Sequence, residues 1–205
     1  MIKIKICGLT NKEDALCAAA LGVDALGFIF CDSPRCITPD TVESIRPFLP
    51  PFMHVVGVFM NHPSDYVNEV ATQCGLDSVQ LHGDESPEYC MAIQHRIIKT
   101  FSVETEADLD KMPLYQGLVS GILVDTKVQA IRGGTGRTFD WTLATVVKEQ
   151  GMPLILAGGI NAGNIKKAIQ LVSPYAIDIS SGVESEPGKK EYNKMSEVIQ
   201  LVKGR

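Results

Sequence analysis

Two side chains that can exchange protons each lie at the end of a predicted β-strand. Cys7 follows residues 2–6, which alternate Ile and Lys, and it precedes a glycine. Asp125 follows the apolar run 121–124 in the same way and precedes a glycine-rich loop. A thiol and a carboxyl group on two strand ends can act as base and acid toward one substrate. The sequence therefore predicts general acid/base chemistry, with Cys7 as candidate base and Asp125 as candidate acid.

Short apolar or β-branched runs alternate with segments of helical period along the whole chain. The predicted strands cover residues 2–6, 25–30, 54–59, 77–81, 96–101, 121–125, 153–157 and 176–180. The predicted helices cover residues 11–21, 39–46, 63–74, 87–95, 104–111, 140–149, 162–171 and 190–203. Eight βα units close a barrel, whereas an open doubly wound sheet, the alternative, usually has about five or six strands. We expect an α/β protein with a single (β/α)8 TIM barrel domain over residues 1–205.

Charge and composition exclude several kinds of partner. The net charge is −5 and no basic cluster is present, which argues against a nucleic-acid surface, because phosphate backbones attract clustered Lys and Arg. No apolar stretch is long enough to span a bilayer, and residues 2–6 do not resemble a signal peptide. The six cysteines show no C-x-x-C spacing and no Cys/His cluster, so we expect neither a disulfide framework nor a metal site. The prediction is a cytoplasmic protein that needs no cofactor.

The last two predicted strands both lead into loops that contain glycine. Gly158 and Gly159 follow the seventh strand, and Ser181 and Gly182 follow the eighth. In a barrel these loops are neighbours, so their backbone N–H groups can converge on a phosphate, helped by a helix N-terminus near Gly182. The alternative is that each glycine only forms a tight turn. The loops after the third and fourth strands lack paired glycines, so we expect one phosphate on the substrate rather than two.

Three further polar residues are candidates for contact with a substrate. Arg35 lies in the loop after the second strand and can bind a carboxylate, with a solvated loop arginine as the alternative. His82 ends the fourth strand and is either catalytic or an orienting or structural group. Asp178 lies in the eighth strand, where an acid that faces the barrel must find a hydroxyl group or a cation. The long loop 127–138 follows the sixth strand and is expected to act as a lid over the same end of the barrel.

Several short motifs, taken in order, closely resemble the phosphoribosylanthranilate isomerases of tryptophan biosynthesis. They are KICGLT at 5–10, SPR at 33–35, GVF at 57–59, VQLHG at 79–83, LVDT at 123–126, GGTGRTFDW at 133–141, AGG at 157–159 and SSGVE at 180–184. The resemblance covers residues 3–191, and its specificity comes from the ordered set. It implies a (β/α)8 barrel that isomerises N-(5-phosphoribosyl)anthranilate to 1-(2-carboxyphenylamino)-1-deoxyribulose 5-phosphate without a cofactor.

The resemblance also implies roles for individual residues. It places the general base on Cys7, the general acid on Asp125, binding of the anthranilate carboxylate on Arg35, and the phosphate on the two glycine loops. Two positions depart from the family pattern: Cys36 stands where many members have an aromatic residue, and Glu191 stands where Asp is usual. The first departure concerns packing around the substrate's aromatic ring, and the second only the first turn of the last helix.

Two other functions stay open on the sequence alone. One is another phosphate-binding barrel isomerase or epimerase, although an epimerase normally needs metal ligands and an isomerase of histidine biosynthesis needs two phosphate loops. The other is a non-catalytic barrel that binds a phosphorylated ligand, and the presence of both Cys7 and Asp125 weighs against it. The expected partner is a phosphorylated aminosugar substrate, and the expected assembly is a monomer or a homodimer.

Overall fold

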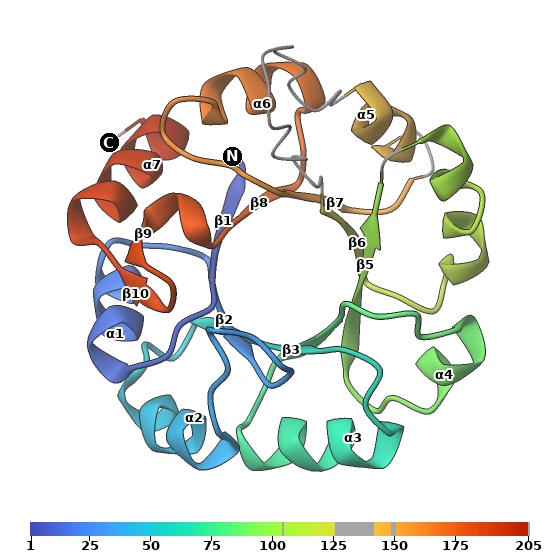
Figure 1. The fold of residues 1–205 in the computed structure, drawn as a ribbon, viewed down its shortest axis with the longest axis horizontal. Coiled ribbons are helices and arrows are strands. Elements are labelled where there is room, and N and C mark those ends of the chain that lie inside the picture. The colour runs from blue at the N-terminus through green and yellow to red at the C-terminus, as the bar shows by residue number, and fades with distance from the viewer. Residues whose placement is uncertain (104, 126–141, 149–150, 205) are drawn as a thin grey trace.

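The chain forms a closed barrel of parallel strands surrounded by helices (Figure 1). The structure is a computed structural model and describes residues 1–103, 105–125, 142–148 and 151–204. The barrel strands are β1 (Lys3–Cys7), β2 (Ala25–Ile29), β3 (His54–Phe59), β4 (Ser78–Leu81), β5 (Arg96–Ser102), β6 (Gly121–Asp125), β7 (Leu154–Ala157) and β8 (Ala176–Ile179). Each strand pairs with the next in chain order, and β8 pairs with β1, which closes the sheet. The predicted (β/α)8 barrel is confirmed, and the open sheet is wrong.

The connections between strands are mostly helical. The α-helices are α1 (Lys12–Ala20), α2 (Pro39–Ile45), α3 (Ser64–Gln73), α4 (Pro87–Met91), α5 (Thr142–Lys148), α6 (Ile165–Val172) and α7 (Tyr192–Lys203). The short 3-10 helices are η1 (Arg46–Phe48), η2 (Glu106–Leu109), η3 (Met112–Tyr115) and η4 (Ser181–Val183). Helix starts follow the residue types that satisfy unpaired amides: the side chain of Asn11 accepts a hydrogen bond from the Asp14 amide at the start of α1.

The helix predicted over residues 87–95 ends early, at Met91. Asn68 of α3 binds the backbone groups just beyond that point. Its side-chain amide donates to the Ala92 carbonyl, and its side-chain oxygen accepts from the Gln94 amide. A tertiary contact therefore accompanies the end of this helix, and no local sequence signal marks it.

The helix predicted over residues 104–111 is also wrong in the part that the structure describes. Two 3-10 helices, η2 and η3, cover this connection instead. At the end of η2 the Asp110 amide donates to the Ala107 carbonyl, three residues back, which is the 3-10 pattern. The described part of this segment therefore forms 3-10 turns in place of a continuous α-helix.

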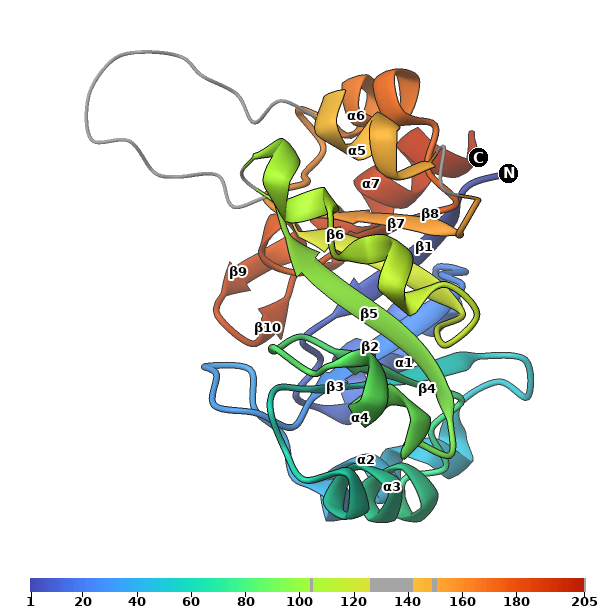
Figure 2. The ribbon, with the colours of Figure 1, turned by 90° about the vertical axis from the view of Figure 1, so that its right-hand side faces the viewer.

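The chain after β8 contains a hairpin that the sequence analysis did not predict. It consists of β9 (Glu184–Glu186) and β10 (Lys189–Lys190), which pair in antiparallel fashion. The last helix consequently begins at Tyr192 rather than at residue 190, and the helix expected near Gly182 is the 3-10 helix η4. In side view the hairpin lies at one end of the barrel, and both chain termini lie at the other (Figure 2).

Two apolar layers hold the barrel together. Alternate residues of each strand point outward and pack beneath the helices, where Ile4, Ile6 and Phe28 are fully buried. A smaller cluster lies inside the barrel and consists of Leu123, Ile155, Ala157 and Ala176, with Ile98 packed against it. Among the described residues, no helix combines the length and the hydropathy needed to cross a bilayer.

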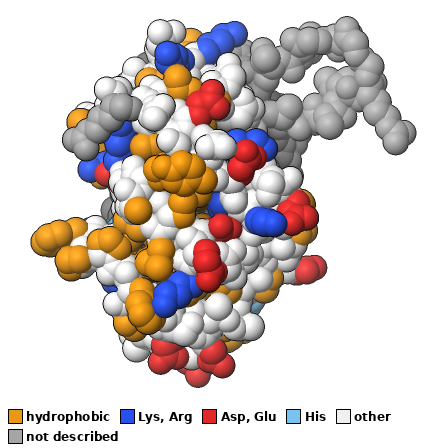
Figure 3. Space-filling model, turned by 90° about the vertical axis from the view of Figure 1, so that its left-hand side faces the viewer, with side chains coloured by type: hydrophobic (Ala, Val, Ile, Leu, Met, Phe, Trp, Pro, Cys, Tyr) orange, Lys and Arg blue, Asp and Glu red, His pale blue; other side chains and the backbone are white. Residues whose placement is uncertain are grey.

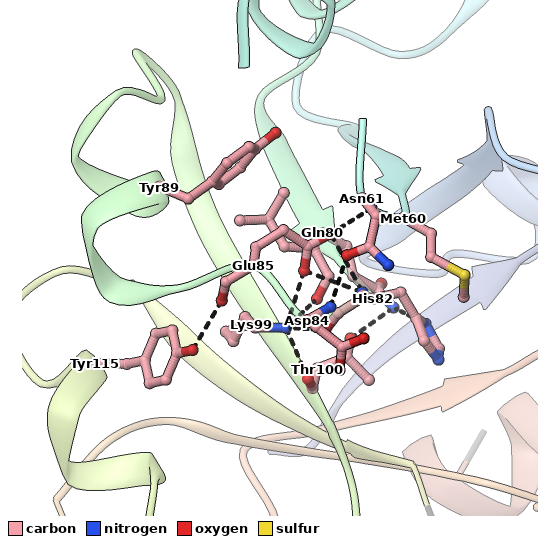
Figure 4. A network of polar contacts seen from close by, with 12 residues as sticks. Met60, Asn61, Gln80, His82, Asp84, Glu85, Tyr89, Lys99, Thr100 and Tyr115 are labelled. Carbon is pink, nitrogen blue, oxygen red and sulfur yellow. Dashed lines mark hydrogen bonds and ion pairs between the residues drawn. The ribbon is translucent and has the colours of Figure 1, made fainter. Parts of the chain in front are cut away.

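A buried ion pair connects two loops to β5 (Figure 4). Lys99 Nζ lies 3.0 Å from Glu85 Oε2, and the two side chains are only 3% and 2% exposed. Lys99 also donates to the Gly83 carbonyl at 2.7 Å, and Glu85 accepts from the Asn61 amide at 2.8 Å. The Tyr115 hydroxyl donates to the Glu85 carbonyl. This network holds the loops after β3 and β4 at the end of the barrel where their strands finish.

Removal of one partner from this pair should destabilise the fold. We expect Lys99→Met to lower the free energy of unfolding by about 3–5 kcal/mol, because the Glu85 carboxylate would stay buried without a counter-ion. Denaturant unfolding followed by circular dichroism measures the change. Lys189→Met is the matched control: its ion pair with Glu186 is 67% exposed on both sides, so we expect a loss of at most about 1 kcal/mol. Equal losses for the two variants would contradict the role assigned to the Lys99–Glu85 pair.

Candidate active site

One pocket opens at the ends of the strands, where interior side chains change from apolar to polar. Its volume is about 290 Å³. Its walls contain every site residue expected from the sequence except Gly182, together with several neighbours. The lining residues are Cys7, Ile29, Arg35, Val58, Gln80, His82, Asp125, Ala157, Gly158, Gly159, Ile160, Asp178, Ser180 and Ser181.

The candidate acid and base belong to strands on different sides of this pocket. Cys7 ends β1 and Asp125 ends β6, and the strands β7 and β8 lie between them on the shorter way around the barrel. A molecule bound in the pocket can therefore contact the thiol from one side and the carboxyl group from another. This arrangement suits proton transfer at two atoms of one substrate.

The Cys7 thiol is almost fully buried, with 6% of the residue exposed. Burial raises the pKa of this thiol, because surroundings of low polarity disfavour the thiolate. The positive charges of Lys5 and Lys190 act in the opposite direction. Cys7 is therefore a thiol whose ionisation depends on the cations around it.

His82 lies next to the carboxyl group of Asp125. The distance from His82 Nε2 to Asp125 Oδ2 is 3.5 Å, and both side chains are partly exposed to the pocket. On the other edge of the ring, Gln80 Nε2 lies 3.4 Å from His82 Nδ1 and 3.2 Å from Thr100 Oγ1. If Gln80 donates to Nδ1, a neutral His82 carries its proton on Nε2 and directs it toward Asp125.

Arg35 is held by a carboxylate, not solvated as the alternative expectation had it. Its Nε and Nη2 donate to the two carboxylate oxygens of Glu184 at 2.8 and 2.6 Å. Burial alone would raise the pKa of Glu184, but the hydrogen bonds from Arg35 and Lys190 outweigh this effect and lower the pKa to about 2. Glu184 is therefore ionised at neutral pH and fixes one edge of the guanidinium group.

Asp178 has the cation partner that its position in the barrel required. Lys5 Nζ lies 3.0 Å from both carboxylate oxygens, and the two side chains are buried. Asp178 reaches the pocket from β8, but its oxygens are engaged by Lys5. Its proposed contact with substrate therefore competes with an ion pair inside the protein.

The two glycine loops touch each other. A Cβ atom on Gly182 would lie 1.9 Å from the Ile160 carbonyl oxygen, so only glycine allows the loop after β8 to approach the loop after β7 this closely. Gly158 and Gly159 have φ values of 90° and 61°, which also favour glycine. Tight turns and close approach therefore both apply here, and the expected adjacency of the two loops is present.

Three residues near the site were not assigned a role from the sequence. They are Lys5, Glu184 and Lys190. Lys190 Nζ is completely buried and donates to the Cys7 carbonyl at 2.6 Å and to Glu184 Oε1 at 2.7 Å. The alternation of residues 2–6 does place Lys5 on the same strand face as Cys7, so this signal was available. No local pattern identifies Glu184 or Lys190.

The proposed lid, residues 127–138, lies outside the described residues. Within the described residues, no three His, Cys, Asp or Glu side chains gather in a way that could hold a metal ion.

Comparisons with known proteins agree on one family. The chain matches the profile described as N-(5'phosphoribosyl)anthranilate (PRA) isomerase over residues 4–201. The N-(5'-phosphoribosyl)anthranilate isomerase of Geotalea uraniireducens is 51% identical over 205 residues, which cover 100% of each chain.

Two solved structures extend this similarity to three dimensions. One is a phosphoribosyl anthranilate isomerase in complex with reduced 1-(o-carboxyphenylamino)-1-deoxyribulose 5-phosphate, with 39% identity, a TM-score of 0.90 and coverage of 100% of both chains. The other shows monomers of the dimeric phosphoribosylanthranilate isomerase of Thermotoga maritima, with 38% identity, a TM-score of 0.89 and the same coverage. The match along almost the whole barrel and the identity of half the residues to a relative lead to one conclusion: this chain belongs to the N-(5'-phosphoribosyl)anthranilate isomerase family.

Proposed function

We propose that this chain converts N-(5-phosphoribosyl)anthranilate to 1-(2-carboxyphenylamino)-1-deoxyribulose 5-phosphate, a step of tryptophan biosynthesis. The observation that carries the proposal is a single pocket with Cys7 and Asp125 on different sides, beside two glycine loops and Arg35. Consumption of freshly prepared phosphoribosylanthranilate, followed by its fluorescence, tests the proposal directly. A protein that binds the substrate without consuming it would be a non-catalytic member of the family.

The reaction is an Amadori rearrangement and needs one acid and one base. Asp125 donates its proton to the ring oxygen of the aminosugar while the bond from that oxygen to the anomeric carbon breaks, and the nitrogen lone pair forms an iminium ion. Cys7, as thiolate, then removes the proton from the neighbouring carbon, and the electrons of that C–H bond neutralise the iminium nitrogen. The resulting enol-amine becomes the ketone when one proton moves from oxygen to carbon. Substrate and product have the same composition, so no cofactor is consumed.

His82 is suited to stabilise Asp125 after proton transfer. The acid begins the reaction protonated and ends this step as a carboxylate. A neutral His82 with its proton on Nε2 can donate to that carboxylate across the 3.5 Å separation, which needs only a small movement to become a normal hydrogen bond. His82 therefore acts as a partner of the acid in this proposal.

Arg35 can bind the anthranilate carboxylate without releasing Glu184. A guanidinium group has five N–H donors, and Glu184 uses the edge formed by Nε and Nη2. No hydrogen bond from Nη1 is present among the described residues, so the edge formed by Nη1 and Nη2 can face a second carboxylate. The glycine loops hold the phosphate at the other end, and two anchored ends place the sugar between acid and base.

The assembly and the location in the cell are also proposals. Hydrophobic side chains gather on the face of the molecule in Figure 3, and the largest exposed fraction among big apolar side chains of the described chain is 99%, at Phe52. Such surface is compatible with a homodimer or with a monomer, which light scattering distinguishes. The cysteines Cys7, Cys17, Cys31, Cys36, Cys74 and Cys90 are all free thiols, which is the state that a reducing cytoplasm maintains.

The proposed acid predicts the effect of Asp125→Asn. The amide keeps the shape of the carboxyl group but cannot deliver the proton, so we expect kcat to fall by about 10²-fold or more while the reduced product analogue still binds. Steady-state kinetics and calorimetry measure the two quantities. A variant with more than about a tenth of the wild-type rate would place the acid elsewhere.

The proposed base predicts a difference between cysteines. Cys7→Ser should lose most activity, because a hydroxyl group is a far weaker base than a thiolate. Cys74→Ser is the matched control, since Cys74 is buried at the end of α3 and away from the pocket. Alkylation should inactivate the wild type, and bound product should protect it. Inactivation that follows the labelling of Cys31 or Cys36 would remove Cys7 from this role.

The proposed carboxylate contact predicts a loss of affinity in Arg35→Met. We expect substrate binding to weaken by roughly 1.5–3 kcal/mol, the value of a charge-assisted hydrogen bond. A substrate analogue without the carboxylate completes the double cycle: it should bind wild type worse than the parent compound does, and the variant should bind both alike. Arg46→Met, on the outside of the barrel, controls for loss of a cation. Equal binding of both ligands by the wild type would argue against the contact.

A further inference from the structure

The inner face of β1 carries a buried ammonium group next to the candidate base. Lys5 and Cys7 are two residues apart in one strand, so their side chains point to the same side, into the barrel. The Lys5 side chain is only 4% exposed. A buried cation needs a counter-ion or a hydrogen-bond acceptor beside it. The two groups near Lys5 that can serve are Asp178 and Cys7, and both line the active-site pocket.

Asp178 orients this ammonium group. It is the register partner of Lys5 across the pairing of β1 with β8, and both of its oxygens lie 3.0 Å from Lys5 Nζ. An ammonium group has three donors. Two are directed at the Asp178 carboxylate, and the charge of Lys5 lowers the pKa of the Cys7 thiol.

The neighbouring strand, β2, leaves space beside the Cys7 sulfur and the Lys5 ammonium group. Gly27 on β2 is the register partner of Cys7. A Cβ atom at this position would lie 2.8 Å from Cys7 Sγ and 3.0 Å from both Cε and Nζ of Lys5. The missing side chain therefore accommodates the two groups together.

We propose that Lys5 is a positioning residue for the isomerisation: its ammonium group, held by Asp178 and admitted by Gly27, stabilises the thiolate form of Cys7. This inference rests on the proposed function, in which Cys7 is the base. The step requires that Cys7 lose its proton before it can accept one from the substrate, and a fixed positive charge beside the sulfur favours that loss.

Several charged groups near Cys7 change the pKa of its thiol, some upward and some downward. Burial raises the pKa of the thiol, Lys5 is the strongest opposing influence, and Asp178 acts with burial. Lys190 lowers the pKa from the side of the hairpin, where its Nζ binds the Cys7 carbonyl. Arg35 and Cys31, in the loop after β2, also interact electrostatically with Cys7. Loss of the Lys5 charge should therefore raise the pKa of Cys7, and loss of the Asp178 charge should lower it.

The test measures the reactivity of the Cys7 thiol directly. The rate of iodoacetamide alkylation at Cys7 is measured by peptide mass spectrometry across a range of pH, beside kcat and KM. In Lys5→Met we expect the midpoint of alkylation to move up by about one pH unit or more, with a tenfold or greater loss of rate at neutral pH. The pH dependence of kcat should move the same way, and KM should change little. Asp178→Asn should shift the alkylation midpoint in the opposite direction.

Matched variants separate this effect from a general loss of structure. Lys3→Met removes a lysine from the same strand, but its pair with Asp24 is at the surface, so the alkylation profile should match the wild type. The double variant Lys5→Met/Asp178→Asn leaves no buried carboxylate unpaired, and its alkylation midpoint should lie above that of Asp178→Asn, because the two differ only in the Lys5 charge. An alkylation midpoint in that double variant equal to that of Asp178→Asn would overturn the proposal.

The two proposals fail in different ways. If Cys7 is not the base, Lys5→Met will still change the alkylation of Cys7, but the pH dependence of kcat will not shift with the alkylation midpoint. If Lys5 does not act on Cys7, alkylation will be unchanged while Cys7→Ser still removes activity.

Discussion

Hydrogen bonding between β8 and β1 closes the sheet, and the site depends on that closure. The same pairing sets Lys5 opposite Asp178, two residues that are 173 positions apart in the chain. Cys7 lies just beyond Lys5, and the glycine loops follow the two strands on the far side of the seam. An open sheet with β1 and β8 at opposite edges would leave the thiol and Lys5 on one edge, and Asp178 and the glycine loops at the other. A closed parallel barrel brings all strand ends to one rim, which is why catalytic groups can come from distant parts of the sequence.

Three ion pairs at this end of the barrel each contain a buried lysine. Lys5 with Asp178, Lys99 with Glu85, and Lys190 with Glu184 each bury a lysine almost completely. Burial of two charges costs desolvation energy that their attraction only partly offsets, so such pairs are weak evidence of stabilisation. The first joins β1 to β8, the second joins the loop after β4 to β5, and the third lies within the hairpin, from which Lys190 also binds the Cys7 carbonyl of β1. We infer that they position the rim, at the expense of part of the stability that apolar residues would provide.

The hairpin β9–β10 shows how this positioning reaches the pocket. Glu184, at its start, holds the guanidinium group of Arg35, and Lys190, at its end, holds both Glu184 and the carbonyl of Cys7. One short element thus links the proposed carboxylate-binding group to the strand that carries the proposed base. The distance between the two ends of the bound sugar would be set by this link and by the contact of Gly182 with the loop after β7.

The repeated βα pattern and the residues at the strand ends could be predicted from the chain alone, because strand and helix periods and turn residues are local properties. The barrel followed from that pattern, and so did the expectation that Cys7, Asp125, Arg35 and His82 lie at one end of it. Three outcomes needed the folded structure: α4 ends beside Asn68, Glu184 pairs with Arg35, and Lys5 pairs with Asp178. These outcomes depend on which distant groups meet when the barrel closes. A buried charge takes its counter-ion from whatever closure places beside it, and no local pattern in the chain records that partner.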